Sequence, residues 1–240
     1  MASTTIRLGL PKGRMQEEVF GLLHDAGIRL TFGRRGYRPQ ISLEQFDAKL
    51  LKPQNVAEML HVGSRDLGFA GADWVAELGL DLVELMDTKL DPVRIVAAAD
   101  PAFDPKGERF RVATEYQRLT EAWLAEQGYD GQVVRTFGAT EVFPPEDADC
   151  VVDNTATGET LRANGLHIFA TLMHSSTRLY ASPHALEDPA KRRGIENFAM
   201  VCKSVLDARR RVMIEANVPA DRLDAVVAVL PGMGSPTVAT

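Results

Sequence analysis

A run of small and hydroxylated residues follows a short apolar segment in the order VVDNTATGETL, residues 151–161. The apolar residues predict a strand and the residues after Gly158 predict a helix, with a loop between them. Backbone N–H groups at a helix N-terminus are unpaired and partly positive, Gly158 allows close approach, and Thr157 and Thr160 add hydroxyl donors. The run therefore has the chemistry of a site for a phosphate monoester.

Two acidic residues belong to the same region of the sequence. Asp153 ends the predicted strand, where its charge makes it a poor phosphate ligand but suits it to ribose hydroxyls or to a magnesium-bound water. The alternative is that Asp153 and Thr157 only cap the helix, which is the commoner role in an isolated motif of this kind. Glu141 lies in the segment FGATE, residues 137–141, after another predicted strand, and it either binds sugar hydroxyls or faces solvent.

Basic residues follow the first predicted strand in the turn PKGR, residues 11–14. Ligands of open α/β sheets bind at strand ends, so Lys12 and Arg14 could hold a pyrophosphate or a triphosphate. The alternative is a solvated turn, since the sequence motif of a P-loop is not found here. Lys52 is a further cation in a loop, and Arg94 stands within an apolar segment, where a buried arginine needs an anionic partner or ligand.

The composition excludes several other classes of function. The 240 residues are 45% hydrophobic and 25% charged, and the net charge of −6 implies no general affinity for nucleic acid or for an anionic membrane. Cys150 and Cys202 form no CxxC pair and the histidines form no cluster, so no disulfide framework and no zinc or other protein-built metal site is expected. The first residues predict neither a signal peptide nor a membrane span, and a cytoplasmic enzyme or binding protein is expected.

The elements that must position these residues alternate between short apolar runs and segments of helical period, which predicts an α/β fold with a mostly parallel sheet. Strands are expected at residues 6–10, 66–70, 93–99, 110–113, 132–136, 150–153 and 178–181. Helices are expected at residues 15–26, 56–60, 72–77, 119–127, 160–164, 189–211 and 220–230. Prolines punctuate the chain after residue 91, so we place a boundary between two lobes near residues 91–93. Residues 1–92 then form lobe I, to which residues 178–211 return, and residues 93–177 form lobe II with the phosphate loop.

Five stretches together resemble the ATP phosphoribosyltransferase family, from residue 8 to about residue 207. They are LPKGR (10–14), KLLKPQNV with DLGFAGADW (49–56 and 66–74), RVATEY (111–116), VVDNTATGETLRANGL (151–166) and SSTRL (175–179). The fourth is the most specific, because the family has an acidic residue at a strand end and then [ST]-G-x-T-[LM]. Asn154 stands where the family usually has an aliphatic residue, and this departure leaves details of the sugar contacts open.

The resemblance implies a two-lobed fold like that of periplasmic binding proteins, with the substrates in the cleft, and it implies Mg²⁺. The reaction implied is transfer of the phosphoribosyl group of phosphoribosyl pyrophosphate (PRPP) to N1 of ATP, with release of pyrophosphate, as the first step of histidine biosynthesis. On this resemblance Lys12 and Arg14 are assigned, with Mg²⁺, to the pyrophosphate or triphosphate, and Lys52 and Arg94 are further anion ligands. The PRPP site comprises Glu141, Asp153, Thr157, Gly158, Glu159, Thr160 and Leu161.

The resemblance also bears on assembly and on regulation. A homo-oligomer is expected, a dimer or a hexamer, with or without a separate regulatory subunit. Residues 212–240 are expected to be a C-terminal linker or an incomplete regulatory-domain stub, through which histidine should not inhibit the chain. The alternatives are a non-catalytic binding protein of the same architecture and a phosphoribosyltransferase of the Rossmann-like type, whose two acidic residues before the loop are replaced here by Asp153 alone.

Overall fold

The first β-turn-α unit forms as the sequence predicts. Strand β1 (Ile6–Pro11) leads through the basic turn into helix α1 (Met15–Asp25). The helix buries Val19, Leu22 and Leu23 completely, at the spacing of one helix face. Because the turn follows the carboxyl end of β1, the two basic side chains lie at the edge of the sheet where ligands of α/β folds bind.

The computed structural model describes residues 5–33, 36–212, 214 and 217–229. The chain divides into two units, Met1–Leu206 and Asp207–Thr240. Among its described residues the second unit contains a short 3₁₀ turn (Ala220–Arg222) and helix α8 (Leu223–Val227). The helix expected over residues 220–230 is therefore shorter in this part, and its last residue lies outside the described residues.

An eight-stranded sheet runs through the first unit in the order β4-β1-β5-β10-β6-β9-β7-β8. Its further strands are β4 (Phe46–Leu51), β5 (Leu67–Gly71), β6 (Val83–Ala99), β7 (Phe110–Thr114), β8 (Gly131–Arg135), β9 (Cys150–Thr155) and β10 (His167–Ala181). The pairs β1–β4, β1–β5, β7–β8 and β7–β9 are parallel, whereas β10 pairs antiparallel with β5 and β6, and β6 with β9. The α/β expectation is confirmed, and the antiparallel pairs occupy the centre of the sheet.

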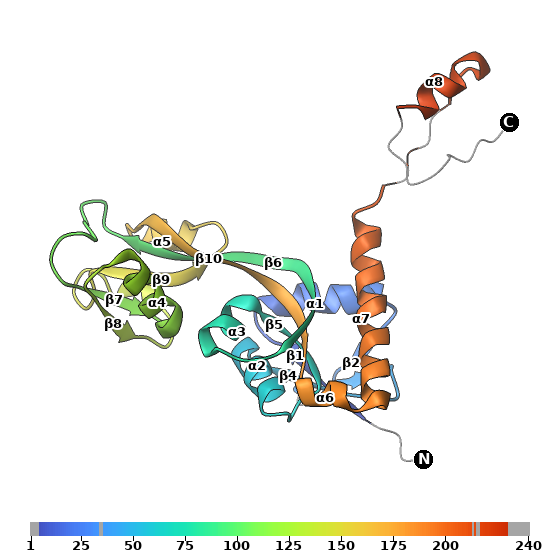
Figure 1. Ribbon diagram of the computed structural model, residues 1–240, viewed down its shortest axis with the longest axis horizontal. Coiled ribbons are helices and arrows are strands. Elements are labelled where there is room, and N and C mark those ends of the chain that lie inside the picture. The colour runs from blue at the N-terminus through green and yellow to red at the C-terminus, as the bar shows by residue number, and fades with distance from the viewer. Residues whose placement is uncertain (1–4, 34–35, 213, 215–216, 230–240) are drawn as a thin grey trace. The chain divides into compact units, whose positions relative to one another are not determined.

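Helices cover both faces of each half of this sheet (Figure 1). Around β1 and β5, α1 and α7 (Pro189–Arg209) share one core, while α2 (Pro53–His61) and α3 (Ala72–Leu78) pack on the opposite face. Around β7 and β9, α4 (Gln117–Gln127) and α5 (Glu159–Ala163) cover opposite faces. Successive residues of β6 enter the two cores alternately, as the period of a strand requires.

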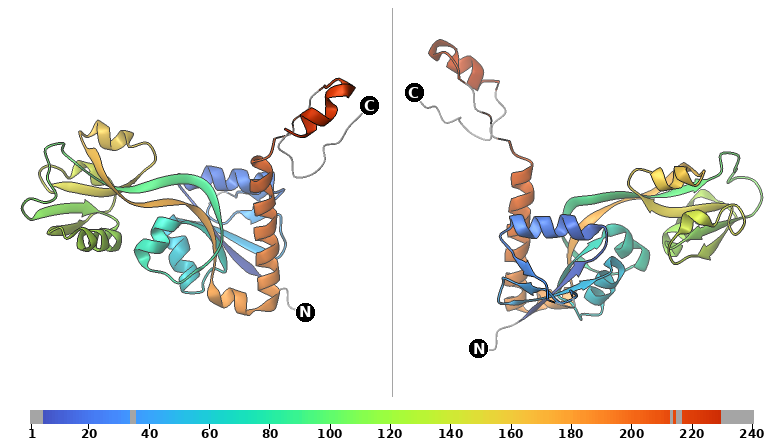
Figure 2. Two further views of the ribbon diagram at one scale, coloured as in Figure 1. Left: turned by 45° about the horizontal axis from the view of Figure 1, so that its top comes forward. Right: turned by 180° about the vertical axis from the view of Figure 1, so that it is seen from behind.

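Strands β6 and β10 belong to both halves and run side by side between them (Figures 1 and 2). They have 17 and 15 residues, whereas the sequence predicts only residues 93–99 and 178–181 as strand. The pairing of the two strands shifts register several times, and Lys89 and Asp91 have left-handed φ angles of 61° and 47°. The boundary expected at residues 91–93 therefore falls inside one continuous strand, and the division into lobes by residue range stays a prediction.

Smaller elements complete the first unit. A two-stranded sheet consists of β2 (Leu30–Thr31) and β3 (Gln40–Ile41), and a short helix, α6 (Pro183–Glu187), follows β10. Cys150 and Cys202 are both buried and free, as the sequence analysis expects. Among the described residues, every helix is too short or too polar to span a bilayer.

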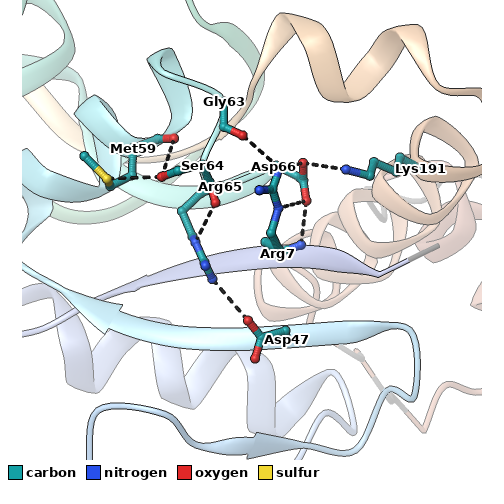
Figure 3. A network of polar contacts seen from close by, with 8 residues as sticks. All are labelled: Arg7, Asp47, Met59, Gly63, Ser64, Arg65, Asp66 and Lys191. Carbon is teal, nitrogen blue, oxygen red and sulfur yellow. Dashed lines mark hydrogen bonds and ion pairs between the residues drawn. The ribbon is translucent and has the colours of Figure 1, made fainter. Parts of the chain in front are cut away.

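An ion-pair network ties the start of α7 to the sheet (Figure 3). Asp66, only 2% exposed, accepts hydrogen bonds from Arg7 Nε and Nη2 at 2.9 and 2.8 Å and from Lys191 Nζ at 2.9 Å. Burial by itself would raise the pKa of Asp66, but these hydrogen bonds outweigh it and lower the pKa to about 2. A second pair, Arg65 with Asp47 at 3.4 Å, lies nearby, and its carboxylate is far more exposed than that of Asp66.

Candidate active site

The loop after β9 has the backbone geometry of an anion cradle. Gly158 precedes α5 with a left-handed φ of 77°, a conformation that favours glycine. The turn is closed by Thr155, whose Oγ1 accepts a hydrogen bond from the Gly158 N–H at 2.8 Å. Thr157 Oγ1 accepts a longer bond from the Glu159 N–H at 3.3 Å, so the capping role applies in part to Thr157. The carboxylate of Asp153 instead accepts the N–H of the next residue, which leaves it beside the loop.

A pocket of about 350 Å³ lies over this loop, and we call it the loop pocket. It brings together residues far apart in the sequence, namely Arg14, Glu141, Asp153, Asn154, Thr155, Ala156, Thr157, Glu159, Thr160 and Leu161. Except for Gly158, which lies between two of these residues, every residue that the sequence analysis assigns to PRPP lines this pocket. The basic turn after β1 also reaches it through Arg14.

The carboxyl group of Asp153 has an unusual environment. Burial raises its pKa to about 6, and the negative charges of Glu115 and Glu141 act in the same direction. The N–H of Asn154 and the charge of Arg14 oppose this shift without cancelling it. The loop pocket thus concentrates acidic groups that a cation or a hydroxyl-rich ligand would stabilise in their charged form.

A second pocket, of about 240 Å³, shares Arg14 and Asn154 with the first, and we call it the central pocket. Its wall includes Lys12 from the basic turn, Asp73 and Trp74 from α3, Tyr116 before α4, and Ser175 of β10. Lys12 is half-buried, and its Nζ lies 5.3 Å from the centre of the Tyr37 ring. Arg14 is half exposed, and its Nε lies 3.3 Å from a carboxylate oxygen of Asp91.

Asp73, Trp74 and Tyr116 are not among the site residues predicted from the sequence. Asp73 is only 5% exposed although it is charged, and Tyr116 is completely buried. One sequence signal was available, because the apolar run at residues 67–72 is followed by an acidic residue in the first turn of a helix. Nothing in the local spacing indicates that this acid meets Tyr116, which lies 43 residues away in the chain.

A third pocket, of about 430 Å³, lies along β6 and β10, and we call it the arginine pocket. It shares Val93, Ser175 and Ser176 with the central pocket and Ala156 with the loop pocket. Its wall carries the basic residues Lys89, Arg94, His174 and Arg178 and the acidic residue Asp87. Arg94 is half-buried rather than fully buried, and within the described part of the chain it takes part in no ion pair.

Lys52 lies apart from this group of side chains. It is exposed and directly precedes α2, and it does not line any of the three pockets described here. Its neighbours Pro53 and Gln54, in contrast, contribute to the central pocket. A role of Lys52 in binding anions stays a prediction from the sequence.

Comparison with protein families gives two matches along the chain. The family model described as "ATP phosphoribosyltransferase" matches residues 52–203, and the one described as "HisG, C-terminal domain" matches residues 208–240. Curated relatives named ATP phosphoribosyltransferase include one from Pelotomaculum thermopropionicum, 38% identical over 97% of this chain and 84% of its own length. Another, from Desulforudis audaxviator, is 39% identical over the same shares of the two chains.

Solved structures share the fold. A chain of the "ATP phosphoribosyl transferase (HisG:HisZ) complex from Thermotoga maritima" matches with a TM-score of 0.76 at 23% identity, over 85% of this chain and all of that one. The periplasmic aliphatic sulphonate binding protein SsuA from Escherichia coli matches with a TM-score of 0.51 at 17% identity, over 86% of this chain and 75% of that one. These likenesses confirm the expected two-lobed architecture of the periplasmic binding proteins.

Proposed function

This chain belongs to the ATP phosphoribosyltransferase family, which catalyses the first step of histidine biosynthesis, and we propose that its three connected pockets bind the two substrates. The reaction transfers the phosphoribosyl group of PRPP to N1 of ATP and releases pyrophosphate. The observation that carries the proposal is that Arg14 and Asn154 line both the loop pocket and the central pocket. Substrates in these two pockets would be neighbours, as a direct transfer requires.

In this proposal the loop pocket binds the phosphoribosyl part of PRPP. The 5-phosphate lies on the backbone of the loop at Thr157 and Gly158, where N–H groups and hydroxyls are available. Asp153 and Glu141 face the ribose, whose hydroxyls can donate hydrogen bonds to carboxylates. Glu159 and Thr160 line the same pocket, and Leu161 anchors the loop because it is buried in the core beneath it.

The polyphosphate groups are assigned to the cations around the other two pockets. Arg14 and Lys12 would neutralise the pyrophosphate of PRPP, which lies next to the loop, while Arg94 in the arginine pocket would take part of the triphosphate of ATP. Lys52 is a more distant anion ligand in this assignment. The adenine ring then occupies the central pocket, beside Trp74.

Magnesium is part of the proposal, and the acidic groups of the loop pocket suit it. Mg²⁺ in phosphate-transferring sites takes one or two carboxylates and completes its shell with substrate phosphates and water. Asp153 and Glu141 would hold it, because burial, helped by the charges of Glu115 and Glu141, raises the pKa of Asp153, and a bound cation would favour its charged form. When bound, the ion would stabilise the charge of the departing pyrophosphate.

The reaction does not require a strong general base. Adenine N1 is a neutral nucleophile that attacks C1 of the ribose, so no proton must leave it before the bond forms. The protein must therefore orient two substrates and neutralise the leaving group.

The proposal is tested by titrating PRPP and ATP separately and then measuring pyrophosphate release. Binding of both without release of pyrophosphate would favour a binding protein of the same fold.

Replacing Arg14 with alanine should lower kcat/KM by about one to two orders of magnitude, because a charge-assisted contact to phosphate is typically worth about 1.5–3 kcal/mol. Lys12→Ala should act in the same direction. Arg109→Ala is a matched control, since Arg109 is exposed and among the described residues pairs with Asp130 alone, at 3.8 Å. Steady-state kinetics with both substrates varied would decide, and a loss below about threefold for Arg14→Ala would favour a solvated turn.

Assembly and location complete the proposal. The related Thermotoga maritima structure is a complex of two kinds of chain, which supports testing this chain for a homo-oligomer, a dimer or a hexamer, and for a separate regulatory subunit. Gel filtration combined with an assay of the isolated chain would separate these arrangements. Both substrates are metabolites of the cytoplasm, and we place the enzyme there.

A further inference from the structure

A continuous chain of side-chain hydrogen bonds runs along the floor of the central pocket and ends at Asp153. Ser175 Oγ donates to Asp73 Oδ1 at 2.6 Å, and the Tyr116 hydroxyl donates to Asp73 Oδ2 at 2.8 Å. Asn154 Nδ2 then donates to the Tyr116 hydroxyl at 3.1 Å and to Asp153 Oδ1 at 3.2 Å. The five residues therefore connect the wall of the central pocket with the acid of the loop pocket.

This chain of hydrogen bonds joins the two halves of the sheet. Asp73 lies at the start of α3, directly after β5, whereas Tyr116 and Asn154 belong to the half built on β7 and β9. The same junction has further contacts. The ring of Tyr116 stacks on Trp74 with centroids 4.8 Å apart, and the carboxylate of Glu77 accepts the N–H groups of two residues at the start of α4, each at 3.0 Å.

The backbone of Tyr116 is held as firmly as its hydroxyl. Its N–H donates to Thr114 Oγ1 at 2.8 Å, and the Thr114 hydroxyl donates to the carbonyl of Val152 at 2.7 Å. Val152 directly precedes Asp153 in β9. Tyr116 is thus tied to the strand that carries Asp153 both through its main chain and through its side chain.

The free-energy cost of burying the Asp73 carboxylate suggests that the chain of hydrogen bonds does more than stabilise the fold. Asp73 is buried, and its carboxylate accepts two hydroxyl hydrogen bonds while forming no ion pair with any described cation. Burying a charge costs free energy that apolar residues of similar volume would not incur. Burial and the neighbouring Asp73 raise the pKa of Tyr116 well above its ordinary value, so its hydroxyl stays protonated and donates.

We propose that Tyr116 and Asn154 are positioning residues for PRPP, which hold the Asp153 carboxylate in a fixed orientation relative to the wall of the central pocket. The inference rests on the proposed function, in which Asp153 faces the ribose of PRPP. Neither residue needs to touch PRPP for this role. The Asn154 amide orients Asp153 directly, and Tyr116 orients the amide, because the hydroxyl oxygen that accepts the amide N–H is itself fixed by the hydrogen bond that it donates to Asp73.

The first test is Tyr116→Phe, which removes the hydroxyl and leaves the ring stacked on Trp74. Since a side-chain hydrogen bond in a buried network contributes about tenfold to an equilibrium constant, the variant should bind PRPP about tenfold more weakly. The KM for ATP should change by less than about threefold, because the ring that lines the ATP pocket is unchanged. Tyr129→Phe is the matched control, since Tyr129 packs on Phe110 and Trp123 in the same core.

The second test is a double-mutant cycle with Asn154→Leu, which has a similar volume but no amide. If Tyr116 and Asn154 act through one chain of hydrogen bonds, the variant that combines Tyr116→Phe with Asn154→Leu should bind PRPP no more weakly than Asn154→Leu alone. Independent, additive losses would overturn the proposal. Thermal unfolding of each variant shows whether it is folded, and a loss of stability with unchanged PRPP affinity would assign the network to the fold only.

The outcomes also separate this inference from the proposed function. If the unmodified chain binds PRPP and Tyr116→Phe binds it within about twofold as well, the inference is wrong and the proposed function stands. If the unmodified chain binds no PRPP, both are wrong. Isothermal titration with PRPP alone, in the presence of Mg²⁺, gives the affinity in each case.

Discussion

Gly158→Val is expected to reduce the affinity for PRPP by at least about a hundredfold while the chain still folds. Gly158 has a left-handed φ of 77°, in which a β-branched side chain is strained. A Cβ atom there would approach Ile168 Cδ1 at 3.2 Å and Arg162 Nη1 at 3.3 Å. Because Arg162 also donates to the carbonyl of Thr157, the loop would have to move as a whole and lose its cradle.

The matched control for this variant is Gly165→Val. Gly165 follows α5 and has a φ of 74°, so it bears the same backbone strain, but a Cβ atom there would meet nothing within 4 Å. Both variants should lose similar stability, and only Gly158→Val should lose PRPP. Isothermal titration of both proteins measures the difference. Equal PRPP affinity in the two folded variants would show that the loop at Gly158 does not bind PRPP.

Asp66→Asn is expected to lower the free energy of unfolding at pH 7 by about 3 kcal/mol. The substitution leaves Arg7 and Lys191 without the carboxylate that they share at 2.8 and 2.9 Å, and it loosens the start of α7 from the sheet (Figure 3). The side chain of Arg7 is 37% exposed, so solvent screens part of the loss, and we expect the lower end of the range for buried pairs.

The pH dependence of this effect follows from the low pKa of Asp66. Its folded-state pKa of about 2 lies below the ordinary value of 3.8, so the carboxylate stabilises the fold at any pH above that ordinary value. The contribution disappears as the pH falls from about 4 to about 2. Urea unfolding at several pH values should therefore show the difference between the unmodified chain and Asp66→Asn shrinking over this window.

Asp47→Asn is the control for Asp66→Asn. Asp47 is 45% exposed and pairs with Arg65 at 3.4 Å, so its removal should change the free energy of unfolding by less than about 1 kcal/mol. The two variants make the same chemical change at two acidic residues of the same network (Figure 3). Similar losses for both would show that burial at Asp66 does not decide the strength of its pairs.

The sequence predicts those parts of the fold whose signals are local. The strand at residues 150–153 and the loop after it are recognisable because apolar residues are followed at once by small hydroxylated ones. Much of β6 and β10 is missed, because residues 83–92 and 167–174 are almost all exposed or half-buried and do not alternate strictly between apolar and polar residues. Strand β4 is also missed, although residues 46–50 alternate between apolar and charged and every second one is buried, which is the pattern of a half-buried strand.

In the site too, residues are predictable where their own strand or turn indicates them, and contacts between distant segments are not. Arg14, Glu141 and Asp153 are predicted separately from their own strands or turns, and the structure brings them to one pocket. The partnership of Asp73 with Tyr116 could not be predicted, because it depends on how α3 packs against the start of α4. Arg94 shows the limit of inferring burial from an apolar neighbourhood, since its strand is buried while its own side chain reaches a pocket.

The position of β10 in the sheet has a consequence for the order in which the chain can fold. β10 lies between β5 and β6, and it is the strand through which those two are connected. Before residues 167–181 leave the ribosome, the strands made so far can form two separate sheets, β4-β1-β5 and β6-β9-β7-β8, each with an unpaired edge. Such edges favour pairing with other chains, so a nascent chain of this protein stays exposed to aggregation until β10 has been synthesised.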